Sequence, residues 1–208
     1  MILPHLYPIV DAELLAAHNV PLDTFARELR AAGVTLLQYR DKNGSPQEIL
    51  RAASILRETF STTPCRLILN DRADLAVLAN FDGVHVGQGD LSPEDARRVV
   101  GPDRIVGVST HTDEQVRIAD QSCADYIAIG PVFTTATKLN PDPVVGLEGV
   151  RRARALTRKP LVAIGGVTRA NARSILDAGA DSIAVISSLF AAHQSPQQVA
   201  RDFLARLR

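Results

Sequence analysis

Short apolar runs alternate with amphipathic helical patterns along this sequence, and that alternation constrains the fold more than any other feature. Runs rich in β-branched and apolar residues predict strands at residues 6–10, 34–39, 66–70, 83–86, 104–108, 126–129, 161–164 and 182–186. Helical patterns lie between and after them, at residues 22–32, 46–60, 73–79, 92–100, 113–121, 147–156, 169–178 and 196–207. Such alternation indicates a parallel sheet with helical crossovers.

Two folds share this alternation, a closed barrel and an open doubly wound sheet. A doubly wound nucleotide-binding fold predicts a glycine fingerprint after its first strand, but residues 10–13 contain no glycine. Gly165 and Gly166 instead follow the seventh predicted strand, where barrels frequently bind phosphate. We therefore expect an α/β fold, a single (β/α)8 TIM barrel with parallel strands formed as one domain by residues 1–208.

Composition restricts the function to a local site. Lys and Arg together number 23, as do Asp and Glu, so no global field attracts nucleic acid or an anionic membrane. Cys65 and Cys123 follow no zinc or CxxC spacing, which predicts small buried hydrophobes and no disulfide framework. The sequence shows neither a signal peptide nor an apolar stretch of spanning length, so we expect a cytoplasmic protein.

Cationic and amide side chains follow the second predicted strand. The period of two in an extended chain places Gln38, Arg40 and Lys42 on one face. A guanidinium can bind two phosphate oxygens at once, and an ammonium adds a mobile charge, so the pattern suits a diphosphate. Taken alone, the segment fits a solvated charge run at a strand end equally well.

Carboxylates follow the third and fourth predicted strands, as Asp71 and Asp90. Mg²⁺ prefers oxygen ligands and is typically bound by one or two carboxylates plus substrate phosphates, so these two residues are candidate Mg²⁺ ligands. A helix N-cap is the alternative for each, but Ser92 is the better cap after Asp90. Asn70 is a candidate donor to a heterocycle or a phosphate.

Further polar residues follow the later strands. Ser109 is the first small polar residue after the fifth, and Thr135, Thr137 and Lys138 lie in a long loop after the sixth. Threonine hydroxyls can donate to a phosphate that the lysine neutralises, although a surface loop is the alternative.

The two histidines near these strand ends are weaker candidates. His85 lies between valines within a predicted strand and is expected to be a core histidine. His111 is a candidate acid, base or phosphate donor, but it also reads as part of a helix start, which the pattern favours slightly.

In combination these segments resemble the thiamine-phosphate synthase family over nearly the whole chain. The motifs that carry the resemblance are Gln38-x-Arg40-x-Lys42, Asn70-Asp71, Gly83-Val84-His85-Val86-Gly87-Gln88-x-Asp90, Gly107-Val108-Ser109, Thr135-x-Thr137-Lys138 and Ile164-Gly165-Gly166. Members of the family are transferases that join a hydroxymethylpyrimidine diphosphate to a hydroxyethylthiazole phosphate. They release pyrophosphate and thiamine phosphate with Mg²⁺ as cofactor.

The resemblance implies a role for each matching residue. The pyrimidine diphosphate would be held by Gln38, Arg40, Lys42, Asn70, Ser109 and Lys138, of which Arg40, Ser109 and Lys138 would be catalytic. Mg²⁺ would be bound by Asp71 and Asp90. The thiazole phosphate would be held by Thr135, Thr137, Gly165 or Gly166, Ile186 and Ser187.

Partners and alternatives follow from the same resemblance. The expected partners are two small phosphorylated substrates, without nucleic acid or membrane, and a homo-oligomer is possible. One alternative is a thiazole tautomerase of the same barrel superfamily, with His111 as its acid or base. Another is a non-catalytic binder of phosphorylated metabolites. The tautomerase has no need for the diphosphate-binding cations, and the binder predicts binding without metal-dependent turnover.

Overall fold

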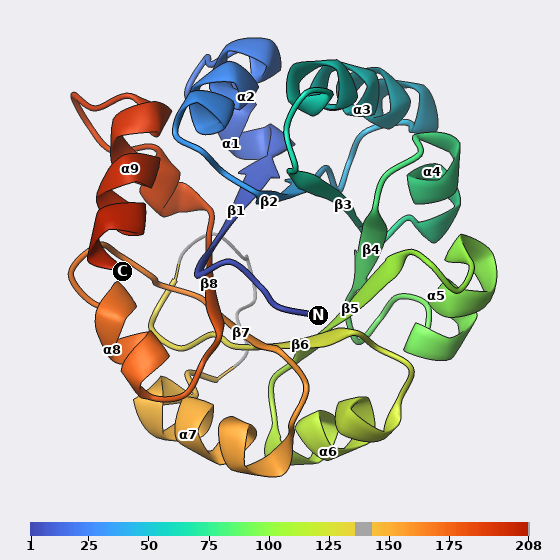
Figure 1. Cartoon of the computed structure of the whole chain (residues 1–208), viewed down its shortest axis with the longest axis vertical. Helices are drawn as coiled ribbons and strands as arrows, with labels where there is room; N and C mark the ends of the chain where they lie inside the picture. Colours follow the sequence, from blue (N-terminus) through green and yellow to red (C-terminus); the bar gives the residue numbers. More distant parts are fainter. Residues whose placement is uncertain (136–142, 208) are drawn as a thin grey trace.

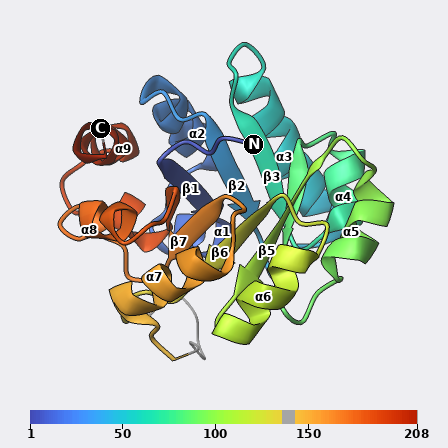
Figure 2. The same cartoon turned by 60° about the horizontal axis from the view of Figure 1, so that its bottom comes forward.

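The computed structural model describes residues 1–135 and 143–207, which form a closed barrel of parallel strands ringed by helices (Figures 1 and 2). The strands are β1 Leu6–Asp11, β2 Leu36–Arg40, β3 Arg66–Asn70, β4 Gly83–Val86, β5 Ile105–Thr110, β6 Tyr126–Ile129, β7 Leu161–Ile164 and β8 Ser182–Val185. Each pairs with the next, and β8 pairs with β1 from Leu6↔Ile183 to Pro8↔Val185. Because the last strand pairs with the first, the predicted closed barrel is confirmed and the doubly wound sheet is excluded.

Helices cover the outside of the sheet. They are α1 Ala12–Ala17, α2 Leu22–Ala31, α3 Pro46–Phe60, α4 Ala73–Leu78, α5 Pro93–Val100, α6 Asp113–Gln121, α7 Gly146–Leu156, α8 Ala172–Asp177, the 3₁₀ helix η1 Ser187–Leu189 and α9 Pro196–Arg206. Helices α1 and η1 were not predicted from the sequence. Among the described residues, no helix is both long and apolar enough to cross a membrane.

The prediction that a helix begins at residue 169 is wrong. A turn separates β7 from α8, in which the Thr168 N–H donates to Asn171 Oδ1 at 2.7 Å and Asn171 Nδ2 donates to the Gly166 carbonyl at 3.0 Å. These side-chain to backbone bonds compete with helix formation, and α8 therefore begins at Ala172. The glycines after β7 consequently lead into a turn, and the start of α8 contributes no dipole directly beside them.

The period of two along the strands divides the buried side chains between two cores. Outward-facing residues, such as Val84 and Val86 of β4, pack between the sheet and the helices. A separate inner cluster fills the barrel, and Leu3 of the N-terminal segment belongs to it. Figure 1 shows this segment crossing the middle of the barrel at the end where the strands begin. The N-terminal segment thus covers one end of the barrel. The other end is formed by side chains at the carboxyl ends of the strands.

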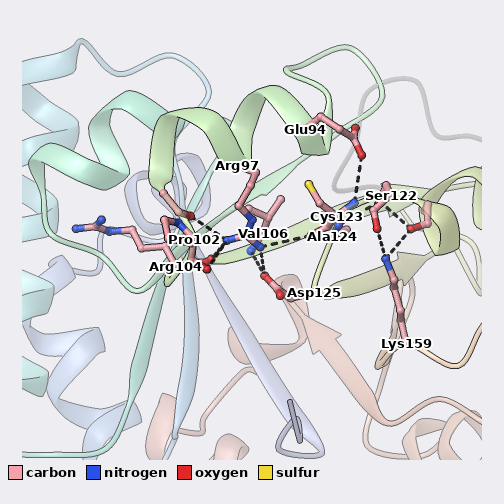
Figure 3. A network of polar contacts seen from close by, with 12 residues as sticks. Glu94, Arg97, Pro102, Arg104, Val106, Ser122, Cys123, Ala124, Asp125 and Lys159 are labelled. Atoms are coloured by element: carbon pink, nitrogen blue, oxygen red, sulfur yellow. Dashed lines mark hydrogen bonds and ion pairs between the residues drawn. The ribbon is translucent and has the colours of Figure 1, made fainter.

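A weak repeat in the sequence places an aspartate directly before each of the strands β4, β6 and β8. In the structure each of these aspartates bonds the backbone of the preceding strand, a contact that we call the aspartate clasp. Asp125 accepts from the Val106 N–H at 2.7 Å through its carboxylate, and its own N–H donates to the Val106 carbonyl at 2.7 Å. Arg97 holds the same carboxylate at 2.6 Å, beside Val106 in Figure 3. Asp82 and Asp181 make the same backbone contacts with Leu67 and Leu161. The repeat therefore supports the barrel and does not form the site.

Replacing Asp125 with alanine should lower the free energy of unfolding by about 2 to 3 kcal/mol, because it leaves the Val106 N–H without its acceptor and removes the ion pair with Arg97. Denaturant unfolding measures the change. The matched control is Asp177→Ala, which removes an exposed carboxylate paired with Arg173 and should cost less than about 0.5 kcal/mol. Equal losses in the two variants would contradict a special role for the aspartate clasp.

Candidate active site

A cavity of about 480 Å³ lies at the carboxyl ends of the strands. Its lining includes twelve of the fourteen residues predicted for the site: Gln38, Arg40, Lys42, Asn70, Asp71, Asp90, Ser109, Thr135, Gly165, Gly166, Ile186 and Ser187. The other two, Thr137 and Lys138, lie outside the described residues, and their roles stay predictions. Barrel closure brings the twelve together, because all the parallel strands have their carboxyl ends at the same rim.

Arg40 is anchored by a buried carboxylate. Asp11 is 2% exposed and accepts from the Leu14 N–H at 3.1 Å through Oδ1, which caps α1. Its Oδ2 forms an ion pair with Arg40 Nη1. Because a guanidinium has five N–H donors, this pair fixes the orientation of Arg40 and leaves other donors for a ligand at the cavity wall. The Arg40 side chain is thus pre-organised at the end of β2.

The two candidate metal ligands lie close together in the structure. Asp90 Oδ2 accepts from the Gly87 N–H at 2.9 Å, and Asp71 forms an ion pair with Lys42. Burial raises the pKa of the Asp71 carboxyl; Lys42 lowers that pKa, and the neighbouring Asp90 carboxyl raises it. Two carboxylates this close repel one another unless a cation lies between or beside them.

The N-cap alternative for these aspartates does not hold. The residue that caps α4 is Arg72, and its side chain makes no capping bond. Asp71 lies one residue earlier with a φ of 63°. Ser92 caps α5, accepting from the Asp95 N–H at 3.1 Å, as the sequence predicted. Both carboxylates are therefore available at the cavity.

This arrangement fits a divalent cation. Within residues 1–135 and 143–207, no three His, Cys, Asp or Glu side chains cluster in a way that could hold a metal. Mg²⁺ does not need such a cluster, since one or two carboxylates, water and substrate phosphate oxygens complete its coordination. Asp71 and Asp90 would supply the protein ligands.

Asn70 presents a donor that lacks a protein partner. Its Nδ2 atom is buried and makes no hydrogen bond in the described part of the chain. Asn70 faces the cavity at the end of β3. A buried, unpaired N–H group is costly, and a ligand acceptor at this position would remove that cost.

The glycines after β7 hold the stem of the loop after β6. Gly165 and Gly166 have φ values of 100° and 62°, which favour glycine. A Cβ at Gly166 would lie 2.6 Å from the Thr134 carbonyl oxygen. The Phe133 N–H donates to the Gly165 carbonyl at 3.0 Å. These contacts bring the loop stem, and with it Thr135, against the end of β7.

Two serines follow β8, and the structure distinguishes them. Ser188 lines the cavity, but its hydroxyl donates to the Val167 carbonyl, so it serves the backbone. Ser187 is exposed and lines the cavity beside Ile186. Ser187, the more exposed of the two, therefore stays the predicted ligand for a phosphate.

His85 occupies the inner face of β4 and is 8% exposed. Its Nε2 contacts Ser109 Oγ at 2.8 Å and its Nδ1 contacts Tyr126 Oη at 2.8 Å. Burial lowers the pKa of His85 from 6.5 to about 4. Asp90 raises this pKa and Lys42 lowers it, each by less than burial does. The imidazole is therefore neutral at neutral pH.

The stability of the barrel should depend on this titration. In the unfolded chain His85 takes a proton as the pH falls below 6.5, whereas in the folded chain it stays neutral until about pH 4. Its contribution to the free energy of unfolding is thus present above pH 6.5 and should decline by about 3 kcal/mol by pH 4. Denaturant unfolding across this range should show a steeper decline for the wild type than for His85→Gln. Parallel curves would contradict the assignment.

Comparison with known proteins identifies the family. The family model described as thiamine monophosphate synthase matches residues 6–189. The chain belongs to this family. It is 57% identical over 204 residues to a thiamine-phosphate synthase of Koribacter versatilis, covering 97% of this chain and 95% of the relative. It is also 40% identical over 189 residues to a thiamine-phosphate synthase of Agrobacterium fabrum, covering 88% and 85%.

A solved structure supports the same family. The thiamine phosphate pyrophosphorylase of Pyrococcus furiosus superimposes with a TM-score of 0.86 at 32% sequence identity, covering 97% of this chain and 94% of that one. The resemblance inferred from the motifs is therefore confirmed at the level of the thiamine monophosphate synthase family. Curated relatives carry the name of an enzyme, a transferase.

Two cavity residues, His85 and Gln88, were not predicted as part of the site from the sequence. The His85 prediction as a core histidine is correct for its burial, yet the residue also contacts Ser109. Gln88 lines the cavity and donates to the Ser109 carbonyl at 2.6 Å. The only available signal was the inward position of His85, two residues before Gly87 in a strand.

His111 has a structural contact that the sequence could not show. Its Nδ1 lies 2.6 Å from the Gly130 carbonyl oxygen, to which it can only donate, and Gln115 Oε1 accepts from its N–H at 2.6 Å. The ring therefore ties the end of β5 to the start of the loop after β6. His111 also lines the cavity, so this structural contact and a position at the site occur together.

Proposed function

We propose that this chain joins hydroxymethylpyrimidine diphosphate to hydroxyethylthiazole phosphate in a Mg²⁺-dependent transfer that yields thiamine phosphate and pyrophosphate. One observation carries the proposal. Cations from the end of β2 and the carboxylate pair Asp71 and Asp90 converge in one cavity with the glycine-lined wall after β7. A site for a diphosphate and a site for a second anion would therefore lie side by side, in a family whose curated members are named thiamine-phosphate synthase.

The pyrimidine diphosphate would occupy the side of the cavity formed by β2 to β5. Arg40, oriented by Asp11, offers a planar set of donors to phosphate oxygens, and Lys42 adds a second cation. Asn70 Nδ2, which lacks a protein partner in the described part of the chain, and the Ser109 hydroxyl would supply neutral donors. Gln38 completes this side, and Lys138 is proposed from the sequence as a further cation.

Mg²⁺, when bound, would neutralise charge on the diphosphate oxygens and so make pyrophosphate a better leaving group. Asp71 and Asp90 would hold it. Lys42 pairs with Asp71 in the structure, and its mobile ammonium could contact a diphosphate when the carboxylates serve a cation instead.

The thiazole phosphate would occupy the opposite side. Gly165 and Gly166 after β7 expose their backbone to the cavity, and Thr135 and Ser187 line the same wall. Backbone N–H groups and hydroxyls suit a phosphate monoester in a barrel at this position. Thr137 is proposed from the sequence as another donor, and Ile186 supplies apolar contact.

No nucleophile on the protein is required for this reaction. Departure of pyrophosphate would leave a methylene cation that the pyrimidine ring stabilises, and the thiazole nitrogen would then attack that carbon. The chain would contribute by stabilising negative charge on the leaving group through Arg40 and Lys42, and by positioning the two substrates.

The two alternative functions make different demands on the cavity. A thiazole tautomerase needs the phosphate wall and a proton-transfer group, but not the carboxylate pair or the β2 cations. His111 lines the cavity with its Nδ1 donating to the Gly130 carbonyl, so the tautomerase is distinguished by the β2 cations and the carboxylate pair, to which it gives no role. A non-catalytic binder would retain ligands without a metal-dependent reaction.

The test is a set of omission reactions with purified protein. We expect thiamine phosphate only when both substrates and Mg²⁺ are present, and none when any of the three is left out. Solvent-deuterium exchange into the thiazole phosphate alone would favour the tautomerase. Binding of both substrates to folded protein without product would favour the binder, and either result would contradict the proposal.

A further inference from the structure

Five polar side chains form a continuous hydrogen-bonded chain across the barrel beneath the cavity. Gln38 Nε2 donates to Tyr7 Oη at 3.0 Å, and Tyr7 Oη lies 3.0 Å from Tyr126 Oη. Tyr126 Oη lies 2.8 Å from His85 Nδ1, and His85 Nε2 lies 2.8 Å from Ser109 Oγ. The chain thus joins the two site residues at its ends through three interior residues.

The interior members are neutral, so each carries a fixed number of protons. Tyr7 is 1% exposed and Tyr126 is fully buried. Burial raises the pKa of both phenols and lowers the pKa of His85. At neutral pH each tyrosine has one O–H to donate, and the imidazole has one N–H and one acceptor nitrogen.

The amide at one end sets the direction of the whole chain. Gln38 Nε2 can only donate, so the Tyr7 oxygen accepts there, and the Tyr7 hydrogen is left for the Tyr126 oxygen. Tyr126 must then donate to His85 Nδ1, which places the single imidazole proton on Nε2. That N–H donates to Ser109 Oγ, and the Ser109 hydrogen remains available to the cavity.

The opposite direction leaves a buried proton unpaired. If Ser109 donated to His85, then His85 would donate to Tyr126 and Tyr126 to Tyr7. The Tyr7 O–H would face the Gln38 N–H donor and have no other partner that the structure records. A buried unpaired donor disfavours this arrangement by roughly fivefold or more in population.

We propose that Tyr7, Tyr126 and His85 are positioning residues that hold Ser109 as a hydrogen-bond donor toward the cavity. The proposal deepens the proposed function, because a diphosphate offers only acceptor oxygens and a Ser109 hydroxyl turned to His85 would present lone pairs to them. Ser109 would be the residue that touches the substrate, and the other three would act through it.

A glycine at position 107 leaves room for this series of hydrogen-bonded side chains. A Cβ atom at Gly107 would lie 2.0 Å from Tyr126 Cζ and 2.4 Å from its hydroxyl oxygen. Gly107 lies on the same face of β5 as Ser109, and it pairs in register with Tyr126. The absence of a side chain there lets the Tyr126 phenol reach across the inner face of β5 toward His85.

The first test is the tautomer of His85 in the ligand-free protein, read from the ¹⁵N shifts of its ring nitrogens. His85→Gln identifies the signal among the five histidines. We expect a protonated Nε2 and an unprotonated Nδ1 at neutral pH. The reverse pattern would overturn the proposal. This measurement needs no substrate, so it is independent of whether the proposed transfer occurs.

Two matched variants test the route. Tyr126→Phe removes the only recorded donor to His85 Nδ1, and its spectrum should shift toward a mixture of tautomers. Tyr7→Phe removes the link to Gln38 but leaves the Tyr126 to His85 bond, so its spectrum should shift less than that of Tyr126→Phe. Equal spectra for the two variants would contradict the proposed direction, and the wild-type spectrum still decides if Tyr126→Phe fails to fold.

A double-mutant cycle separates positioning from a general loss of structure. Tyr126→Phe should lower kcat roughly tenfold in the wild-type background, since it weakens one hydrogen bond to the substrate. In the Ser109→Ala background the same change should have almost no further effect, because Tyr126 acts through Ser109. Additive losses would overturn the proposal. If no variant turns over but the tautomers are as expected, the proposed function fails and the direction of the chain stands.

Discussion

Asp90→Asn should lower Mg²⁺-dependent turnover by roughly a hundredfold or more while leaving the barrel folded. An asparagine oxygen can still accept from the Gly87 N–H, so the turn survives, but the charge that would hold the cation is lost. Asp71→Asn should act similarly, since asparagine tolerates a φ near 63°. Steady-state kinetics across a Mg²⁺ titration measures the effect, which should include a higher requirement for the metal.

The matched control for both variants is Asp74→Asn. Asp74 is close in sequence to Asp71 and pairs with Arg72 outside the cavity lining, with a side chain 57% exposed. It should leave turnover and the Mg²⁺ requirement unchanged. Normal metal dependence in Asp71→Asn and Asp90→Asn would remove both carboxylates from the proposed cation site.

Arg40→Met should reduce turnover by roughly a hundred- to a thousandfold, because the guanidinium would stabilise charge that develops on the departing pyrophosphate. Arg40→Lys should recover only part of that loss, since an ammonium cannot bind two oxygens in the planar manner of a guanidinium. Kinetics with saturating thiazole phosphate and varied pyrimidine diphosphate measures both. Asp11→Asn should produce a smaller loss of the same kind, since Asp11 orients Arg40.

The control for Arg40 is Arg27→Met. Arg27 pairs with Asp23 one turn away on the exposed face of α2, with side chains 61% and 46% exposed. This variant should keep wild-type kinetics and lose little stability. If Arg40→Met also turned over normally, the leaving-group role of Arg40 would be wrong.

Much of the barrel could be predicted from the sequence, because strand and helix periods are local properties. The predicted strand at residues 83–86 and the predicted helix at residues 46–60 coincide with β4 and α3. The start of α8 could not be predicted, because it depends on the Asn171 side chain accepting a backbone N–H. Helix α1 was also missed, because it follows β1 with no loop between them: Asp11 both ends the strand and caps the helix.

Much of the candidate site could be predicted for a different reason. Parallel strands of a barrel all end at one rim, so polar residues at separate strand ends must lie near one another. Arg40, Asn70 and Ser109 could therefore be expected around one cavity before any of their side-chain contacts were known.

The contacts inside the barrel were beyond sequence reasoning. Tyr7 and Tyr126 lie 119 residues apart on β1 and β6, which are not neighbouring strands. The period of two predicts that both face inward but not that their hydroxyls meet. The pairing of Asp11 with Arg40 also required the register of β1 against β2. Such contacts depend on side-chain length and barrel geometry, which no local pattern encodes.

In the proposed reaction, one cavity couples departure of pyrophosphate to capture by the thiazole. The most direct measurement follows thiamine phosphate and pyrophosphate in the same reaction of the wild-type protein with both substrates and Mg²⁺. We predict that the two products form in equal molar amounts from the first turnovers onward. Pyrophosphate without thiamine phosphate would show hydrolysis in place of transfer, and that result, or the absence of both products, would contradict the account.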